Sequence, residues 1–312
     1  MHPSVAVIGT VFVDYKGFAP KGYNPVGRNV GRVEIVPGGV ARNVAVNMRH
    51  LSVATWFVGT INQDGAGETL KSKMNSYGIH LDYLTEVPYG GTGAWLVILG
   101  EDGSLLGSVS QMPDVQVMRD AIVPVLPEIT SKVDGIALEI DLSEDIARAV
   151  ITQAKANDCK LYALPGNFSV IGKNYDMFAD IECFICNEVE AGILFGETIT
   201  ESGKMLSEAI YFAKQYKLKN FVVTMGENGS VYIDHAGASG FQDIYQTRVV
   251  DSTGAGDAFF SATTAALLHK STLAQAVDVG AKIASMVISA KESDCSEFAA
   301  KISENFKLDW FK

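Results

Sequence analysis

One stretch of the sequence, residues 251–262, reads Asp251-Ser252-Thr253-Gly254-Ala255-Gly256-Asp257-Ala258-Phe259-Phe260-Ser261-Ala262. It follows a predicted strand, 246–250, and leads into a long Ala-rich segment that predicts a buried helix. The small residues at 254–256 allow successive backbone N–H groups to turn toward one point at the helix start. A helix start of this kind, with the positive end of the helix dipole, binds anions.

Asp257 stands at the edge of this predicted anion-binding turn, where its charge would repel the ligand that the turn attracts. Its position is explained if Asp257 takes a proton from a nucleophile that then attacks a bound phosphate. The alternative is an ordinary helix N-terminus with an aspartate in its first turn, which occurs in many proteins. The twelve residues favour the catalytic interpretation.

The composition is that of a globular protein, since 47% of the 312 residues are hydrophobic and 20% are charged. This length favours one large α/β domain, or such a domain with a small appendage. A net charge of −11 argues against nucleic acid or an anionic membrane as partner, because both need a basic protein surface. We therefore expect a small-molecule ligand.

No apolar run is long enough to span a membrane, and the first residues lack the plan of a signal peptide, so we expect a cytoplasmic protein. The four cysteines are Cys159, Cys183, Cys186 and Cys295. The spacing of Cys183 and Cys186 is that of a metal site, but no second pair occurs and both lie in an apolar strand. We expect buried, reduced thiols.

Short apolar runs alternate with helical patterns along most of the chain, which indicates a mostly parallel sheet with helices on both faces. Strands are predicted at 5–8, 56–59, 135–139, 160–164, 182–186, 220–225 and 230–233, and helices at 41–51, 67–77, 144–157, 188–195, 202–217, 255–269 and 273–290. Ligands bind beyond the carboxyl ends of such strands. We therefore expect one rim to carry Asp14, Glu139, Pro165, Asn187, Gly226 and the turn at 251–257.

Two separated segments differ from this plan and predict a small β-sheet. Residues 33–36 alternate like a half-exposed strand, and 94–99 and 105–109 flank a turn at 100–103, as in a β-hairpin. We predict a lid formed by 15–36 and 92–111, which protrudes from a main domain of 1–14, 37–91 and 112–312. Its apolar residues Trp95, Val97 and Leu99 predict an exposed face that joins two copies in a homodimer.

With Gly38-Gly39-x-x-x-Asn43, the stretch 251–262 resembles the PfkB or ribokinase family of carbohydrate and nucleoside kinases. It agrees with the C-terminal signature of the family at every restricted position, and 37–51 agrees with the N-terminal one. The two signatures lie about 210 residues apart in the right order, and the resemblance extends over essentially the whole chain. It implies a three-layer α/β/α fold of the ribokinase kind with a small β-sheet lid. It also implies transfer of the γ-phosphoryl of ATP to an alcohol group.

The resemblance implies a role for each matching residue. Asp257 would be the catalytic base, and the N–H groups of Gly254, Ala255 and Gly256 would bind the transferring phosphoryl group. The substrate hydroxyls would be bound by Asp14 and Asn43, with Gly38 and Gly39 leaving room for the backbone to approach the substrate. For the glycine pair and Asn43, the alternative is a turn before an early-helix polar residue.

On the nucleotide side, Asn187-Glu188-Val189-Glu190 matches the N-x-x-E motif of the family, in which the glutamate organises Mg²⁺ and its waters. The alternative is a helix cap with acids in the first turn. Thr224 to Gly229 matches the nucleotide loop, or forms a plain turn between two strands. No Walker A sequence is present. The implied ATP-binding residues are Asn187, Thr224, Gly226, Gly229, Gly254 and Gly256.

The chain also departs from the family pattern. Leu164 stands where many relatives have Asp or Asn, which implies one polar contact fewer near the phosphates. Residues 289–296 lack the Gly-rich loop that helps to form the monovalent-cation site of ribokinase. The sequence therefore does not decide whether a K⁺ site is present, and its candidate ligands are Asp251 and Thr253.

The acceptor is predicted to be an uncharged nucleoside or sugar with a primary hydroxyl. Glu139 lies where phosphosugar kinases of the family carry basic residues, and the turn at 166–168 has no arginine. The stretch 14–43 is most similar to pseudouridine kinases, which favours the 5′-OH of pseudouridine. Acceptors like those of ribokinase, adenosine kinase and fructokinase are the alternative substrates. For Arg42, which precedes Asn43, the alternative is a solvated helix residue. A non-catalytic sugar-binding relative and a Rossmann-type oxidoreductase are the alternatives of other classes.

Overall fold

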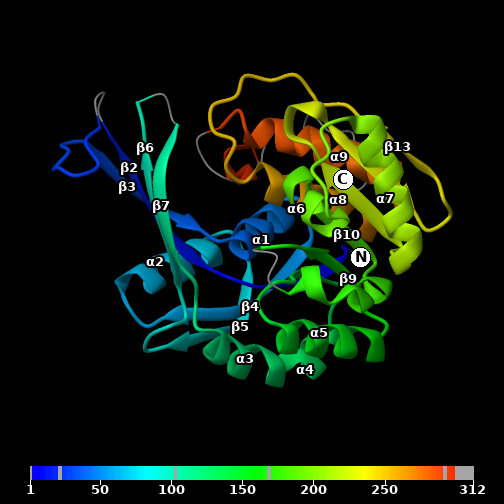
Figure 1. Cartoon of the computed structure of the whole chain (residues 1–312). Coiled ribbons are helices and arrows are strands. Elements are labelled where there is room, and N and C mark those ends of the chain that lie inside the picture. The colour runs from blue at the N-terminus through cyan, green and yellow to red at the C-terminus, as the bar shows by residue number, and fades with distance from the viewer. Residues whose placement is uncertain (1, 20–22, 102–103, 167–169, 291–293, 299–312) are drawn as a thin grey trace.

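The computed structural model describes residues 2–19, 23–101, 104–166, 170–290 and 294–298 (Figure 1). Within them the chain forms a nine-stranded sheet and a separate four-stranded sheet. This is the predicted ribokinase-like α/β fold with its second, smaller sheet. No helix among the described residues is long and apolar enough to cross a membrane.

The large sheet has the order β13-β12-β11-β10-β9-β8-β1-β4-β5. Its strands are β1 (Ser4–Ile8), β4 (Ala54–Asn62), β5 (His80–Val87), β8 (Gly135–Glu139), β9 (Lys160–Leu164), β10 (Cys183–Asn187), β11 (Asn220–Thr224), β12 (Ser230–Asp234) and β13 (Ser239–Gln242). All neighbours pair in parallel except β11 with β12 and β12 with β13. The parallel strands are short apolar runs because both of their faces are covered by helices.

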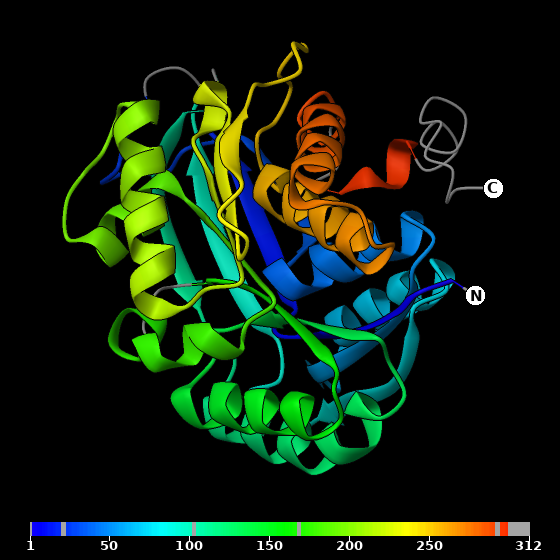
Figure 2. The same ribbon diagram turned by 90° about the vertical axis from the view of Figure 1, so that its right-hand side faces the viewer.

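Helices cover both faces of this sheet, which makes three layers (Figure 2). One apolar core lies under α3 (Val115–Ile122), α4 (Leu126–Thr130), α5 (Glu144–Ala156), α6 (Glu188–Phe195) and α7 (Ser202–Tyr216). The other lies under α1 (Val40–His50), α2 (Gly65–Ser76), α8 (Ala255–Leu268) and α9 (Leu273–Val287). The four cysteines are free and buried, as predicted.

The small sheet has the order β3-β2-β6-β7 and projects from the main body (Figure 1). Its strands are β2 (Phe12–Phe18), β3 (Arg32–Gly38), β6 (Gly93–Leu99) and β7 (Leu105–Gln111). β2 pairs antiparallel with β3 and parallel with β6, so two distant segments of the chain form one sheet. The hairpin β6–β7 was predicted, and its predicted turn lies partly outside the described residues. The exact division into domain and lid stays a prediction.

The faces of the small sheet differ from the prediction. Val97 is fully buried and Trp95 and Leu99 are partly buried, so these three residues do not form an exposed face. They lie on the same face as Asp14 and Lys16, because β2 and β6 pair in register. The other face of the small sheet carries exposed apolar side chains, namely Val33, Ile35, Leu96 and Val109.

Residues 246–250 do not form a strand, which corrects a second prediction. Val249 and Val250 are 63% and 50% exposed, and the segment pairs with no strand of the described chain. β-propensity describes how well a residue fits a half-buried pleated surface, and this segment has no such surface to pack on. It runs instead along a cavity that is described below.

Candidate active site

The catalytic residue predicted from the sequence lies in the first turn of α8. The Oδ2 atom of Asp257 accepts a hydrogen bond of 2.8 Å from Nδ2 of Asn43 on α1. The two residues meet because α8 packs against α1. The sequence predicts both as site residues from signatures far apart in the chain, and the fold brings them into direct contact.

The environment of Asp257 suits a general base that acts near neutral pH. Removal of water from around the carboxylate raises its pKa to about 7, the hydrogen bond from Asn43 opposes this shift, and the charge of Glu139 adds to it. The Oδ1 atom of Asn43 is buried and has no hydrogen-bond partner among the described residues. A buried acceptor without a partner is costly, so this atom fits a hydroxyl donated by a substrate.

The turn before α8 has the geometry of an anion site. Gly254 is the N-cap of α8 and has φ 80°, a left-handed conformation that favours glycine. The N–H groups of the first helical turn, which includes Gly256 and Asp257, have no acceptor within the helix. The N–H of Ala255 donates to the carbonyl of Ser252 at 3.3 Å. Phosphate binding by Gly254, Ala255 and Gly256 stays a prediction.

Asp14 lies on β2 directly over the Gly38-Gly39 pair. A Cβ atom at Gly38 would stand 2.3–2.4 Å from the Asp14 carboxyl group, and one at Gly39 would stand 2.7 Å from the carbonyl oxygen of Thr10. Gly39 also has φ 99°. Each glycine is thus required for a different physical reason. Among the described residues none donates a hydrogen bond to Asp14, and the binding of substrate hydroxyls by its carboxylate stays a prediction.

Replacing Gly38 with alanine is expected to raise the KM for the acceptor by about 10-fold, because the loss of one good hydrogen bond costs about 1–2 kcal/mol. The added methyl group overlaps the Asp14 carboxyl group and displaces it. The KM for ATP should not change. Initial-rate kinetics with each substrate varied in turn measures both constants. Gly107→Ala on β7 is the control, since a Cβ atom there meets open space. An unchanged acceptor KM in Gly38→Ala would contradict substrate binding by Asp14.

Glu139, predicted to contact the substrate, ends β8 and is 4% exposed. Its Oε2 atom accepts hydrogen bonds from the N–H and the hydroxyl of Thr10 at 2.9 and 2.8 Å. Cβ atoms at Gly9 and Gly166 would overlap its carboxyl group, so two further loops pack on it. Burial raises its pKa. This carboxylate holds the loops of the rim together, and its contact with the substrate stays a prediction.

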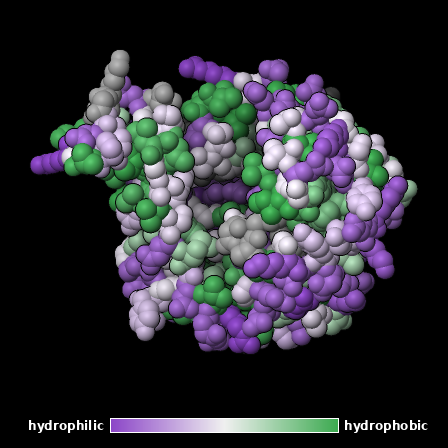
Figure 3. All heavy atoms as spheres, viewed as in Figure 1, coloured by the Kyte–Doolittle hydropathy of each residue, from purple (hydrophilic) through white to green (hydrophobic). Residues whose placement is uncertain are grey.

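A cavity of about 560 Å³ adjoins the turn at 251–257. Of the residues predicted to bind ATP, the lining contains Asn187, Thr224, Gly226, Gly229 and Gly256. The other side of the cavity was not predicted from the sequence; it includes Tyr245, Val249, Phe259, Ala284 and Ile288. Figure 3 also shows a hollow with hydrophilic residues at its base, between the small sheet and the main body.

Glu190, the predicted magnesium residue, forms a capping box with Asn187 at the start of α6. Its Oε2 atom accepts from the N–H of Asn187 at 2.7 Å, and Oδ1 of Asn187 accepts from the N–H of Glu190 at 2.9 Å. The capping alternative is therefore present in the structure. Burial raises the pKa of Glu190 to about 7, the bond from Asn187 opposes this, and the charge of Asp141 adds to it. Its charge also acts on Asp257.

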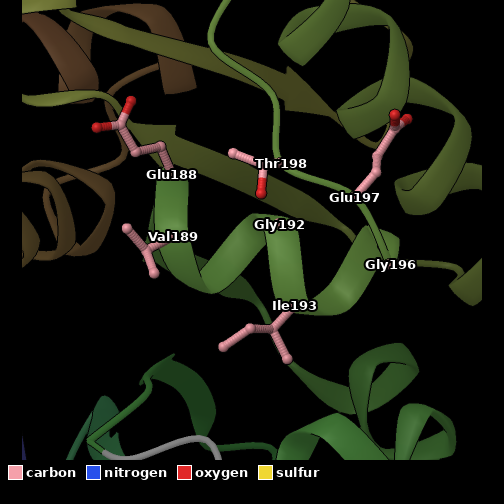
Figure 4. A pocket seen from close by; sticks show the side chains of 7 residues that line it. All are labelled: Glu188, Val189, Gly192, Ile193, Gly196, Glu197 and Thr198. Carbon is pink, nitrogen blue, oxygen red and sulfur yellow. The ribbon is translucent and has the colours of Figure 1, made fainter.

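A second cavity of about 400 Å³ lies over α6 (Figure 4). It is lined by Glu188, Val189, Gly192, Ile193, Gly196, Glu197 and Thr198, and none of the predicted site residues is among them. Two of its lining residues, Glu188 and Val189, lie between Asn187 and Glu190 in the chain, so this cavity lies at the same helix without sharing a predicted site residue.

Two buried cations, Arg42 and Lys16, border the site, and neither pairing is evident from the sequence. The predicted alternative that Arg42 is solvated is wrong, since its side chain is 2% exposed and pairs with Asp294 at 2.7 Å. Lys16, on β2, has a side chain that is 11% exposed and pairs with Asp251 at 3.4 Å. The spacing of two residues between Asp14 and Lys16 was an available signal, because it places both side chains on one face of a strand. Leu164 packs in the core, as its hydrophobic side chain requires.

Comparisons with known proteins identify the family of the chain. Residues 2–297 match the pfkB family carbohydrate kinase. A guanosine-inosine kinase of Exiguobacterium acetylicum is 35% identical over 295 residues, which cover 93% of this chain and 95% of that protein. The pseudouridine kinase of Escherichia coli (strain K12) is 27% identical over 285 residues, with coverages of 91% and 90%. The structure of Arabidopsis thaliana ribokinase complexed with ribose and ATP has a TM-score of 0.80 at 22% identity, with coverages of 97% and 99%.

The family match and the similar kinases define a phosphotransferase whose acceptor is an alcohol group. The chain belongs to the pfkB family of carbohydrate kinases. The predicted family, fold and class of reaction are thereby confirmed.

Proposed function

We propose that the protein transfers the γ-phosphoryl group of ATP to the 5′-OH of an unphosphorylated nucleoside. The observation that carries this proposal is the contact between Asn43 and Asp257 at the start of α8. This contact supports the proposal because Asn43, which we propose to bind the acceptor, lies beside a carboxylate whose pKa is raised to about 7. Both groups border a turn with the geometry of an anion site.

In the proposed reaction, Asp257 accepts the proton of the 5′-OH as the hydroxyl oxygen forms its bond to the γ-phosphorus. The bond between that phosphorus and the β–γ bridging oxygen breaks, and ADP leaves. The first-turn N–H groups of α8 and the helix dipole stabilise the negative charge of the transferring group. Asp14 and Asn43 hold the acceptor so that its hydroxyl lies in line.

The residues around the cavity fit ATP with a divalent cation. Glu190 and Asp257 repel each other electrostatically, and Asp141 adds to the charge at Glu190. Carboxylate oxygens are ligands that Mg²⁺ prefers, directly or through water, so Glu190 would hold the ion beside the phosphates. When bound, Mg²⁺ would offset the charge of the phosphoryl oxygens. Asn187, Thr224, Gly226 and Gly229 would contact the nucleotide.

The charge distribution supports an unphosphorylated acceptor. Lys16 is already paired with Asp251, and Arg42 with Asp294. Binding a phosphate on the acceptor would require the partly buried Lys16 pair or the fully buried Arg42 pair to break, and a charge that loses its partner in a buried site is costly. The buried carboxylate of Glu139 would add repulsion.

A nucleoside is favoured over a free sugar by the small sheet. Its site-facing side carries Phe12 and Trp95 close to Asp14, because Trp95 is opposite Asp14 in the register of β2 and β6. Both aromatic side chains are partly buried, and aromatic faces bind planar bases by stacking. Guanosine or inosine is the first candidate, supported by the 35% identical relative. Pseudouridine is the second, supported by the 27% identical relative and by the similarity of the stretch 14–43.

Release of ADP from ATP and Mg²⁺ tests the acceptor with guanosine, inosine, pseudouridine, adenosine, D-ribose and D-fructose in parallel. We expect kcat/KM for guanosine or inosine to exceed that for D-ribose by about 5- to 160-fold, since stacking of one base contributes about 1–3 kcal/mol and each 1.36 kcal/mol is a factor of about ten. Turnover confined to the free sugars would contradict the nucleoside assignment. ATP consumption with none of the six compounds would contradict it as well.

The small sheet is proposed to act as a lid over the acceptor and as the contact between two copies in a cytoplasmic homodimer. The contact surface would be the exposed face with Val33, Ile35, Leu96 and Val109. Multi-angle light scattering should give the mass of a dimer for the wild type and of a monomer for Ile35→Glu. A wild-type monomer would exclude the dimer and leave the kinase proposal intact.

A further inference from the structure

Lys16 connects the two halves of the candidate site. It lies on β2 two residues after Asp14, so both side chains are on the site-facing side of the strand. Its Nζ atom is 3.4 Å from Oδ2 of Asp251, more than 200 positions away in the sequence and at the start of the turn that leads into α8. The strand that carries the acceptor-binding Asp14 is thus tied to the anion-binding turn.

Asp251 determines the shape of that turn. Its Oδ1 atom accepts from the N–H of Thr253 at 2.8 Å, and its own N–H donates to the carbonyl of Ile288 at 3.3 Å. Partial burial acts to raise the pKa of Asp251, but the hydrogen bonds with Thr253 and the charge of Lys16 outweigh burial, and its pKa is lowered. The carboxylate is therefore ionised and has a protein cation as its counter-charge.

This arrangement does not fit a monovalent metal ion at the Asp251 side chain. Both carboxylate oxygens are engaged, Oδ1 by an N–H group and Oδ2 by an ammonium group. A K⁺ ion there would meet the positive charge of Lys16 at close range.

We propose that Lys16 is a positioning residue for phosphoryl transfer, whose ammonium group holds Asp251 and the 251–257 turn against β2 in the place of a monovalent cation. The inference rests on the proposed kinase function. It predicts that the reaction needs no K⁺. It also predicts that Lys16 acts through Asp251 rather than on the substrate.

A double-mutant cycle tests this inference. Lys16→Met and Asp251→Asn are each expected to lower kcat by about 10-fold, with the KM for the acceptor nearly unchanged, because small displacements of reacting groups cost that much. Asn at 251 keeps a carbonyl oxygen for the N–H of Thr253 and removes only the charge. The double variant should be no slower than either single variant. Lys16→Arg should recover most of the rate.

The matched control is Lys155→Met, which breaks an exposed pair with Asp180 and should leave kcat unchanged. Additive losses in the double variant, or a loss confined to the KM for the acceptor, would overturn the inference, since either shows that Lys16 acts without Asp251. Wild-type rates should be equal in potassium and sodium salts, and stimulation by K⁺ alone would also overturn it.

Hydrogen exchange gives a measurement that does not depend on activity. The amide of Thr253 should exchange faster in Lys16→Met than in the wild type, while Lys155→Met leaves it unchanged. Equal exchange in all three proteins would overturn the proposed link. If the wild type phosphorylates no acceptor, the proposed function is wrong. The hydrogen-exchange measurement still decides whether Lys16 holds the turn.

Discussion

Asp257→Asn is expected to lower kcat by about 10²–10⁴, the usual contribution of a positioned general base. Asparagine keeps the size of the side chain and can still bond to Asn43, but it cannot accept the proton of the attacking hydroxyl. The KM for ATP should change little. Steady-state ADP release with guanosine gives both constants. Asp180→Asn is the control, because it alters an exposed acid that pairs with Lys155.

The pH dependence of the wild type gives an independent check on the same residue. Because the pKa of Asp257 is raised to about 7, the free enzyme carries the active carboxylate only above that pH. We therefore expect kcat/KM to increase by at least tenfold per pH unit below about 7 and to level off above it, because Glu190, whose pKa is also raised to about 7, adds to the slope. The limb of the residual activity of Asp257→Asn should be less steep by a factor of ten per pH unit. A wild-type profile that is flat through neutral pH would contradict the role of Asp257 as base.

The same shift predicts the effect of Asp257 on stability. A carboxyl group whose pKa is higher in the folded state binds protons more tightly when folded, so its contribution to stability falls as pH rises from the unfolded value to about 7. Asp257→Asn should therefore have a higher Tm than the wild type, with a larger difference at pH 8 than at pH 5. Differential scanning calorimetry at the two pH values measures this difference.

Gly256→Val is expected to lower kcat/KM for ATP by about 10²–10³, comparable to the loss of one oxyanion-hole donor. Gly256 is the second residue of α8, lines the cavity, and has open space where a Cβ atom would stand. The variant should thus fold while its side chain occupies the position proposed for the phosphoryl group.

Gly203→Val on α7 is a closely matched control for this substitution. Gly203 is also the second residue of its helix, and a Cβ atom there likewise meets open space. Any general cost of valine at this position of a helix appears in both variants, whereas the loss of ATP turnover should appear only at 256. Equal losses in the two variants would contradict phosphate binding at the start of α8.

The predictable parts of the fold are strands whose two faces are both covered by helices, and helices with a clear apolar periodicity. β8 and β9 have the predicted bounds, because a short apolar run between two helices has few alternatives. β2 was missed because its site-facing residues, Asp14 and Lys16, are polar and interrupt the expected apolar alternation. A functional strand therefore looked like a loop.

Candidate site residues can be predicted where neighbouring residues in the chain carry the signal, as in the turn before α8. The partners of Lys16 and Arg42 could not, since Asp251 and Asp294 are each more than 200 positions away and only the packing of the small sheet and of the C-terminal residues against α1 brings them close. Charge alone did not separate these buried cations from solvated ones.

The position of the transferred phosphoryl group shows whether Asp257 activates the 5′-OH of a nucleoside. After incubation of guanosine or pseudouridine with ATP and Mg²⁺, ³¹P NMR coupled to the sugar protons identifies the phosphorylated oxygen. We expect a 5′-monophosphate formed in equal amount to ADP by the wild type and nearly absent with Asp257→Asn. Formation of ADP and inorganic phosphate without a nucleoside monophosphate, or equal product from both proteins, would contradict this expectation.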